Sequence, residues 1–171
     1  MSDPAAVDLT RCQRLLVGHG ALVLLFSFIV GFGFVFFLIG EISLWPIPGR
    51  IDYQMPGTYD AWRMAHMEGI VNGFGLWIVA LVLPLVPASA VLRTRITWGM
   101  ILVAWTIVVA ATIDPLFPDA RGLAFGGNAA NNVAFFLFFI GIATVIWVVA
   151  MIAVRCLGPA GREAGADHGG D

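Results

Sequence analysis

The chain has 171 residues, of which 60% are hydrophobic and only 12% are charged. A soluble domain of this size usually has about twice that share of charged residues, so the composition indicates a protein that lies in a lipid bilayer. The basic residues are nine arginines, set against eleven acidic residues, and the formal net charge is −2. Because this balance provides no basic surface, we expect no nucleic-acid partner.

Four apolar segments predict membrane-spanning helices, because each is close to or above the roughly 20 residues that cross the hydrocarbon core. They cover about residues 15–39, 61–86, 96–113 and 133–154. We therefore predict an all-α membrane protein, a single four-helix transmembrane bundle over residues 1–158. The first segment is longer than the apolar part of a signal peptide, so we expect it to be retained. Residues 159–171 are small and polar and predict a disordered C-terminal tail.

Arginine is unevenly distributed between the two ends of these segments. One end has six arginines and the other has three: Arg11, Arg14, Arg93, Arg95, Arg155 and Arg162 against Arg50, Arg63 and Arg121. The cytoplasmic ends of membrane proteins are enriched in basic residues. We therefore expect both termini to lie in the cytoplasm.

Polar side chains inside apolar spans are costly to place in lipid, so they mark the positions where function is sought. These residues are His19, His66, Glu68, Asn72, Thr106, Thr112 and Thr144. Intramembrane threonines usually return their hydroxyl to their own helix backbone, so their default role is structural. His19 lies between two glycines near the cytoplasmic end, and we interpret it as a hydrogen-bonded interfacial residue.

On a helical wheel of 100° per residue, His66 shares a face with Trp62, Arg63, Gly69 and Gly73. One interpretation is a Gly-xxx-Gly contact with another helix, in which the histidine is bonded to a neighbour. The other is a cofactor-binding face, on which the glycines let a porphyrin lie close to the backbone beside Trp62. His66 would then ligate the iron and Arg63 would pair with a propionate. The residues fit both interpretations.

Two further polar residues of the same segment lie off this face, Glu68 by about 200° and Asn72 by about 120°. Asn72 could reach the same cofactor only from a neighbouring subunit. A second histidine is also excluded as a ligand of the same iron. The depths of His19 and His66 differ by roughly 15 Å or more at 1.5 Å per residue, whereas two axial ligands lie about 4 Å apart. The sequence therefore predicts one histidine per iron, which leaves the other side open for a substrate.

Several short motifs occur along the chain in an order that is typical of one family. They are Gly18-His19-Gly20, Pro56-Gly57, Trp62, Ala65-His66, Asn72-Gly73, Pro84, Trp105, Arg121-Gly122-Leu123 and Phe125-Gly126. With these motifs the chain resembles the styrene oxide isomerases, small four-span bacterial membrane enzymes that bind haem b. Each motif alone is weak, and their shared order and spacing over residues 18–127 make the resemblance specific.

The resemblance implies an isomerase that converts an aryl epoxide to the aldehyde by a 1,2-hydride shift, with ferric haem b on His66 as a Lewis acid. It implies that Asn72 is catalytic and orients the bound oxygen. It also implies a small apolar epoxide as substrate, and a homotrimer in the bacterial inner membrane with haem at the subunit interfaces. The alternative is a haem b-binding membrane protein with another role, such as electron transfer, sensing or a different substrate.

One position departs from the family pattern. The family has a catalytic tyrosine seven residues after the tryptophan that matches Trp105, and this sequence has Thr112 there. Threonine keeps a hydroxyl but loses the reach of the ring, so it would need a bridging water to place a donor at the same point. We keep Thr112 as a candidate catalytic residue. Without the tyrosine, we expect that the iron and Asn72 suffice for isomerase activity, that the substrate differs, or that the protein has another function.

Overall fold

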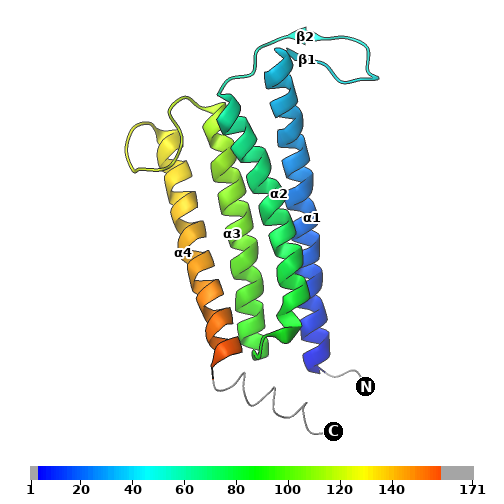
Figure 1. Cartoon of the computed structure of the whole chain (residues 1–171), viewed down its shortest axis with the longest axis vertical. Coiled ribbons are helices and arrows are strands. Elements are labelled where there is room, and N and C mark those ends of the chain that lie inside the picture. The colour runs from blue at the N-terminus through cyan, green and yellow to red at the C-terminus, as the bar shows by residue number, and fades with distance from the viewer. Residues whose placement is uncertain (1–3, 159–171) are drawn as a thin grey trace.

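The computed structural model describes residues 4–158, and these form a bundle of four long helices, with two long connections at one end and a short one at the other (Figure 1). In chain order the elements are α1 (Pro4–Ile39), β1 (Glu41–Ile42), β2 (Ile51–Asp52), α2 (Tyr59–Val82), the 3-10 helix η1 (Leu83–Leu85), α3 (Ala90–Leu116) and α4 (Ala129–Leu157). The four α-helices of this part of the chain are long and apolar enough to cross a membrane, which confirms the predicted four-helix architecture. The tail predicted over residues 159–171 lies outside the described residues.

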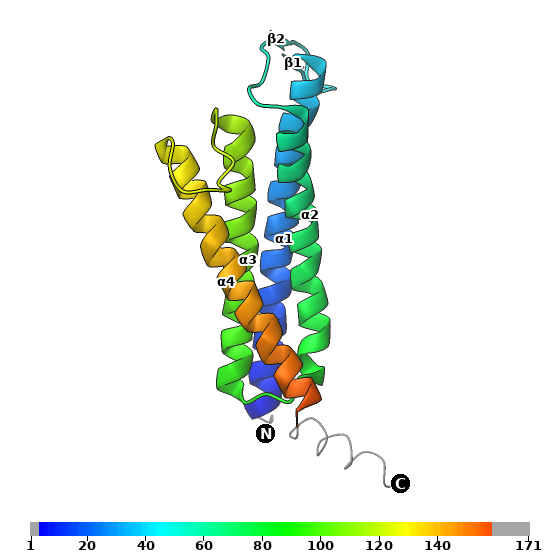
Figure 2. The same cartoon turned by 60° about the vertical axis from the view of Figure 1, so that its left-hand side comes forward.

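Helix α1 begins and helix α4 ends at the same end of the bundle, which we call the terminal end. The strands and the connection from α3 to α4 lie at the opposite end, which we call the loop end. Helix α1 packs most extensively against α2, and α3 contacts α1, α2 and α4. Helix α4 packs mainly against α3 and is inclined across the other helices (Figure 2). The pair of α1 and α2 therefore forms one side of the bundle, and α4 forms the other.

Each of the last three long helices begins at a polar residue whose side chain accepts a hydrogen bond from the first turn. Thr58 accepts from the Ala61 amide at 3.3 Å, and Ser89 accepts from the Leu92 amide at 3.4 Å. Asn128 accepts from the Asn131 amide at 2.8 Å. Helices α1, α3 and α4 are longer than the predicted apolar segments, whereas α2 begins two residues before its predicted start and ends at Val82, where η1 takes over. The predicted end of the first segment at residue 39 is confirmed, and the other boundaries of α1, α3 and α4 differ because polar residues at the ends of the segments are still helical.

A short hairpin connects α1 to α2 at the loop end. Its strands pair Glu41 with Asp52 and Ile42 with Ile51 in antiparallel register. Arg50 lies 3.6 Å from the Glu41 carboxylate and 3.7 Å from that of Asp52. Arg50 and Asp52 are largely exposed and Glu41 is partly exposed, so the ion pairs contribute little stability.

Two buried clusters hold the helices together. The larger one lies between α1, α2 and α3 and includes the fully buried Leu16, Leu76 and Ile96. The smaller one lies nearer the loop end and contains Val30, Trp62, Ala65 and Ala111. Many large apolar side chains on the outward faces stay exposed, as is expected of a surface that lies in lipid. The smaller cluster positions the candidate site, because His66 follows Ala65 on α2.

Candidate functional site

The imidazole of His66 is held by the backbone of α1. Its Nδ1 lies 2.9 Å from the carbonyl oxygen of Ser27, and the Ser27 hydroxyl donates to the His66 carbonyl oxygen at 2.7 Å. A carbonyl oxygen can only accept a hydrogen bond, so Nδ1 carries the proton. In the neutral ring the lone pair is then on Nε2, which forms no hydrogen bond within residues 4–158. Metal-ligating histidines usually show this arrangement, with one ring nitrogen bonded to a carbonyl and the other available to the metal.

Gly31 makes room for the His66 ring on the facing side of α1. A Cβ atom at this position would lie 2.9 Å from Cε1 and 3.0 Å from Nδ1 of His66, which is closer than real Cβ contacts. With any larger residue at position 31, the imidazole or the helix would have to shift. Sequence reasoning missed both Ser27 and Gly31. The available signal was their spacing, since small residues four apart in an apolar helix permit close helix contacts.

Trp62 lies one turn before His66 on α2 and is buried. Its indole N–H donates to the Pro56 carbonyl oxygen at 2.8 Å, which ties the start of α2 to the preceding loop. Its ring covers Gly33 of α1, where a Cβ would lie 2.7 Å from Cζ3. Trp62 therefore fixes the approach of α1 and α2 next to His66.

Gly69 and Gly73 form contacts with α1, which corrects the expectation of an open groove beneath a porphyrin. A Cβ at Gly69 would lie 2.7 Å from the Ser27 Oγ, and one at Gly73 would lie 2.6 Å from Leu24 Cγ. Both glycines are buried. Of the two interpretations of this face, the structure therefore shows the helix contact for the glycines. The wheel could not decide between them, because it places residues on a face without showing what covers that face.

Arg63 lies at the surface near the loop end. Its guanidinium is 3.6 Å from the Asp60 carboxylate, and the two side chains are 59% and 80% exposed. An ion pair with this exposure contributes little, so the guanidinium can exchange its partner at low cost. Arg63 is therefore accessible to an anionic group that approaches the start of α2.

Asn72 is bonded to Glu68, one turn earlier on α2. The amide nitrogen of Asn72 donates to the Glu68 backbone carbonyl at 2.9 Å and to its Oε2 at 3.1 Å. These partners fix the orientation of the amide, because only its nitrogen can donate. An intramembrane carboxylate needs a polar partner, and Glu68 has one on its own helix in Asn72.

Two more of the intramembrane polar residues, Thr112 and His19, have structural partners. The Thr112 hydroxyl donates to the Val108 carbonyl oxygen at 2.8 Å, the bond to its own helix backbone that is expected of an intramembrane threonine. His19 accepts a hydrogen bond from the Trp105 indole N–H through Nδ1 at 3.2 Å and lies edge-on to Trp98. His19 and His66 do not meet, since His66 is bonded to Ser27, eight residues further along α1 than His19.

A cavity of about 460 Å³ opens at the loop end, between the start of α2 and the end of α3. It is lined by Pro56, Gly57, Thr58, Asp60, Ala61, Met64, Asp114, Phe117, Pro118, Asp119 and Arg121. Gly57 has φ +96° and packs against the backbone of Pro115, which only glycine permits at this distance. Arg121 lies 3.9 Å from the Asp114 carboxylate. The cavity brings two of the sequence motifs, Pro56-Gly57 and the arginine of Arg121-Gly122-Leu123, to one place.

Comparison with known proteins identifies the family. The sequence model of the styrene oxide isomerase family matches residues 12–157. The chain belongs to the styrene oxide isomerase family. It is 30% identical to a styrene-oxide isomerase of Pseudomonas fluorescens over 148 residues, which are 85% of this chain and 86% of that protein. The predicted resemblance is thereby confirmed.

In this styrene oxide isomerase family member, the motifs that carry the resemblance contact one another across the bundle. The indole of Trp105 on α3 binds His19 of the Gly18-His19-Gly20 motif. Gly20 of the same motif packs against Trp77 and the Gly73 backbone. The Pro56 carbonyl accepts from Trp62. Many of these motif residues therefore hold the helices in register, while Nε2 of His66 forms no hydrogen bond within residues 4–158.

Proposed function

We propose that this protein is a membrane isomerase that converts an aryl epoxide to the corresponding aldehyde, with ferric haem b on His66. Family membership supports an epoxide isomerase. The observation that carries the haem assignment is the bond from His66 Nδ1 to the Ser27 carbonyl, which leaves the lone pair on Nε2, a nitrogen that forms no hydrogen bond within residues 4–158. When bound, the haem would supply a Lewis acid for the epoxide oxygen.

The residues around His66 fit a haem ligand better than a bare metal site. Within residues 4–158 no group of three or more His, Cys, Asp and Glu side chains could hold a metal ion. A porphyrin supplies the equatorial ligands itself and needs only an axial residue from the protein. His66 provides that residue, and Arg63 provides an exchangeable cation for a propionate. Gly69 and Gly73 are left out of the proposed haem contacts, because α1 covers them.

Asn72 is the proposed catalytic residue on the open side of the haem. It lies about 120° from His66 around α2 and roughly 9 Å along it, so one chain cannot place both residues on one haem. We infer a homotrimer in the bacterial inner membrane, with termini in the cytoplasm and haem between subunits. Each haem would then take His66 from one chain and Asn72 from the next.

The apolar surroundings suit this isomerisation. The C–O bond to the benzylic carbon breaks, a hydride moves to that carbon from its neighbour, and the carbonyl forms on the neighbour, so no atom is gained or lost. Water would instead trap the cation as a diol, and the lipid-facing helices exclude it and concentrate the apolar epoxide. The chain needs to supply orientation rather than an external base.

The position of Thr112 supports a second candidate, a haem b-binding membrane protein with another role or another substrate. Its hydroxyl is bonded to its own helix at Val108, so it does not replace a tyrosine that reaches into the site. Loss of one hydrogen-bond donor to a developing oxyanion costs on the order of 10²–10³-fold in rate. An isomerase that relies on the iron would therefore remain measurable.

Turnover of an epoxide distinguishes the isomerase from a haem b-binding protein with another role. We expect the haem-loaded protein to convert styrene oxide or a bulkier aryl epoxide to the aldehyde without added cofactor, and reduction to ferrous iron to suppress the reaction. Thr112→Tyr is expected to raise styrene oxide turnover, and Thr112→Ser is the matched control that keeps a hydroxyl without the ring. If a haem-loaded protein converts no member of an aryl and alkyl epoxide panel, the isomerase proposal fails and only the haem assignment stands.

A further inference from the structure

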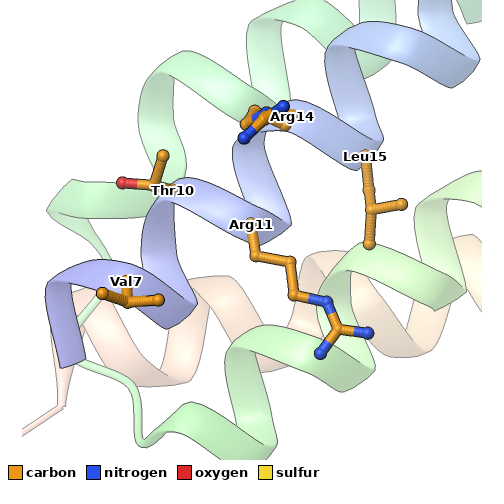
Figure 3. Close-up of a pocket in the computed structure, with 5 residues that line it drawn as sticks. All are labelled: Val7, Thr10, Arg11, Arg14 and Leu15. Carbon is orange, nitrogen blue, oxygen red and sulfur yellow. The ribbon is translucent and has the colours of Figure 1, made fainter. Parts of the chain in front are cut away.

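An open cavity of about 640 Å³ lies against the first turns of α1 at the terminal end (Figure 3). We call it the α1 groove, and it is lined by Val7, Thr10, Arg11, Arg14 and Leu15. These residues recur at intervals of three and four, so they share one face of the helix. The groove combines two cationic side chains with apolar side chains at either end. It is far from His66 along the bundle and plays no part in the proposed reaction.

The two arginines of the α1 groove differ from those at the loop end in their partners. Arg50, Arg63 and Arg121 each form an ion pair with a carboxylate. Within residues 4–158, Arg11 and Arg14 form none. At the terminal end the described residues include five arginines and a single carboxylate, that of Asp8. Asp8 and Arg11 line the same neighbouring cavity without forming an ion pair. The groove therefore carries two guanidinium groups that form no ion pair with a carboxylate in the described part of the chain.

An apolar strip continues from the groove along the same face of α1. It consists of Leu15, Gly18, Leu22 and Leu25, all within about 60° of the direction of Arg11 on a helical wheel. Leu22 is 51% exposed and Leu25 is 57% exposed. Nothing lies within 4 Å of the position that a Cβ would take at Gly18, so the strip has an open notch there. The rise from Arg14 to Leu25 is about 16 Å, which matches half of the roughly 30 Å hydrocarbon core.

We propose that the α1 groove and this strip form a binding site for one anionic phospholipid. Arg11 and Arg14 would bind the phosphate, because the planar guanidinium donates paired hydrogen bonds to phosphate oxygens. An acyl chain would lie along the strip and through the notch at Gly18. Basic pockets on the cytoplasmic side of membrane proteins bind phospholipid headgroups in this way. The length of the strip favours a lipid over a soluble phosphate, which would leave it uncovered.

The test is native mass spectrometry of the full chain, titrated with phosphatidylglycerol or with phosphatidylcholine of the same acyl chains. We expect phosphatidylglycerol to bind the wild type on the order of tenfold or more tightly than phosphatidylcholine. The double variant Arg11→Gln with Arg14→Gln should lose this preference. Arg155→Gln, at the last turn of α4 and the same end of the bundle, is the matched control and should keep it. Gly18→Leu should weaken binding of both lipids by filling the notch.

Three outcomes would overturn the proposal. If the double variant kept the wild-type preference for phosphatidylglycerol over phosphatidylcholine, the lipid would bind elsewhere. Displacement of the lipid by millimolar inorganic phosphate would show a site for soluble anions. Dissociation of an oligomer in the double variant, without a change in lipid preference, would show that this face is a contact between subunits. Circular dichroism of each variant checks that the helices are retained, and none of these readouts depends on haem or turnover.

Discussion

The surroundings of the two intramembrane histidines show how one residue type can serve two purposes. His66 donates from Nδ1 to a carbonyl oxygen of α1, which leaves the lone pair on Nε2. His19 does the reverse, because the Trp105 indole can only donate and so Nδ1 of His19 must carry the lone pair. The proton of neutral His19 is then on Nε2, where a metal ligand needs a lone pair. The hydrogen-bond partner, rather than depth or burial, distinguishes the candidate ligand from the structural histidine.

The largest expected effect is on haem content when each histidine is replaced by alanine. His66→Ala is expected to lower haem content from about one per chain to near zero, because His66 is the proposed axial ligand. His19→Ala should keep its haem and lose only the bond to Trp105. The measurement is Soret absorbance per protein after purification, with membrane insertion checked in parallel. Equal haem loss in both variants would remove the distinction.

A second contrast uses two glycines of α1. A Cβ at Gly31 would lie 2.9 Å from His66 Cε1, whereas a Cβ at Gly18 would have nothing within 4 Å. Gly31→Ala should therefore shift the imidazole and weaken haem binding, on the order of 10–100-fold as for disturbed partners of metal ligands. Gly18→Ala should leave it unchanged. Haem transfer to apomyoglobin measures both, and unchanged transfer in Gly31→Ala would show that Gly31 does not position the ring.

The pair of Glu68 and Asn72 allows a test on turnover rather than on haem binding. Glu68→Ala removes the Oε2 acceptor that orients the Asn72 amide, and we expect turnover to fall on the order of tenfold. Glu68→Gln keeps an acceptor oxygen and should stay close to the wild type. Both variants should retain their haem. If Glu68→Gln loses as much turnover as Glu68→Ala, the carboxylate charge matters and the orienting role is wrong.

The smallest effect is expected at Trp105. Trp105→Phe removes the donor to His19 but keeps most of the ring packing against Phe26. A side-chain hydrogen bond between helices in a membrane contributes about 0.6 kcal/mol on average. The free energy of unfolding should fall by roughly that amount, with haem content unchanged. Urea or detergent unfolding of the purified protein measures the loss, and a loss of haem here would give His19 a role that its bonding does not indicate.

The sequence predicted the helices and singled out His66 as a candidate because both leave a local signal. Long apolar segments indicate membrane spans, and a histidine inside such a segment is costly enough to indicate function. The partners of His66 leave no such signal, since Ser27 and Gly31 are ordinary small residues and only the packing of α1 on α2 brings them to the ring. The same limit explains Gly69 and Gly73. Their shared face was predicted correctly, but whether a helix or a cofactor covers it depends on contacts between segments.

The central claim is that a single histidine, His66, ligates the iron through Nε2. The most direct test is electron-nuclear double resonance of the ferric protein grown with ¹⁵N-histidine, in the wild type and in His19→Ala. We predict strong coupling to the ligating nitrogen of one histidine per iron, identical in both proteins. Coupling to two histidines, or loss of the coupling in His19→Ala, would contradict the account.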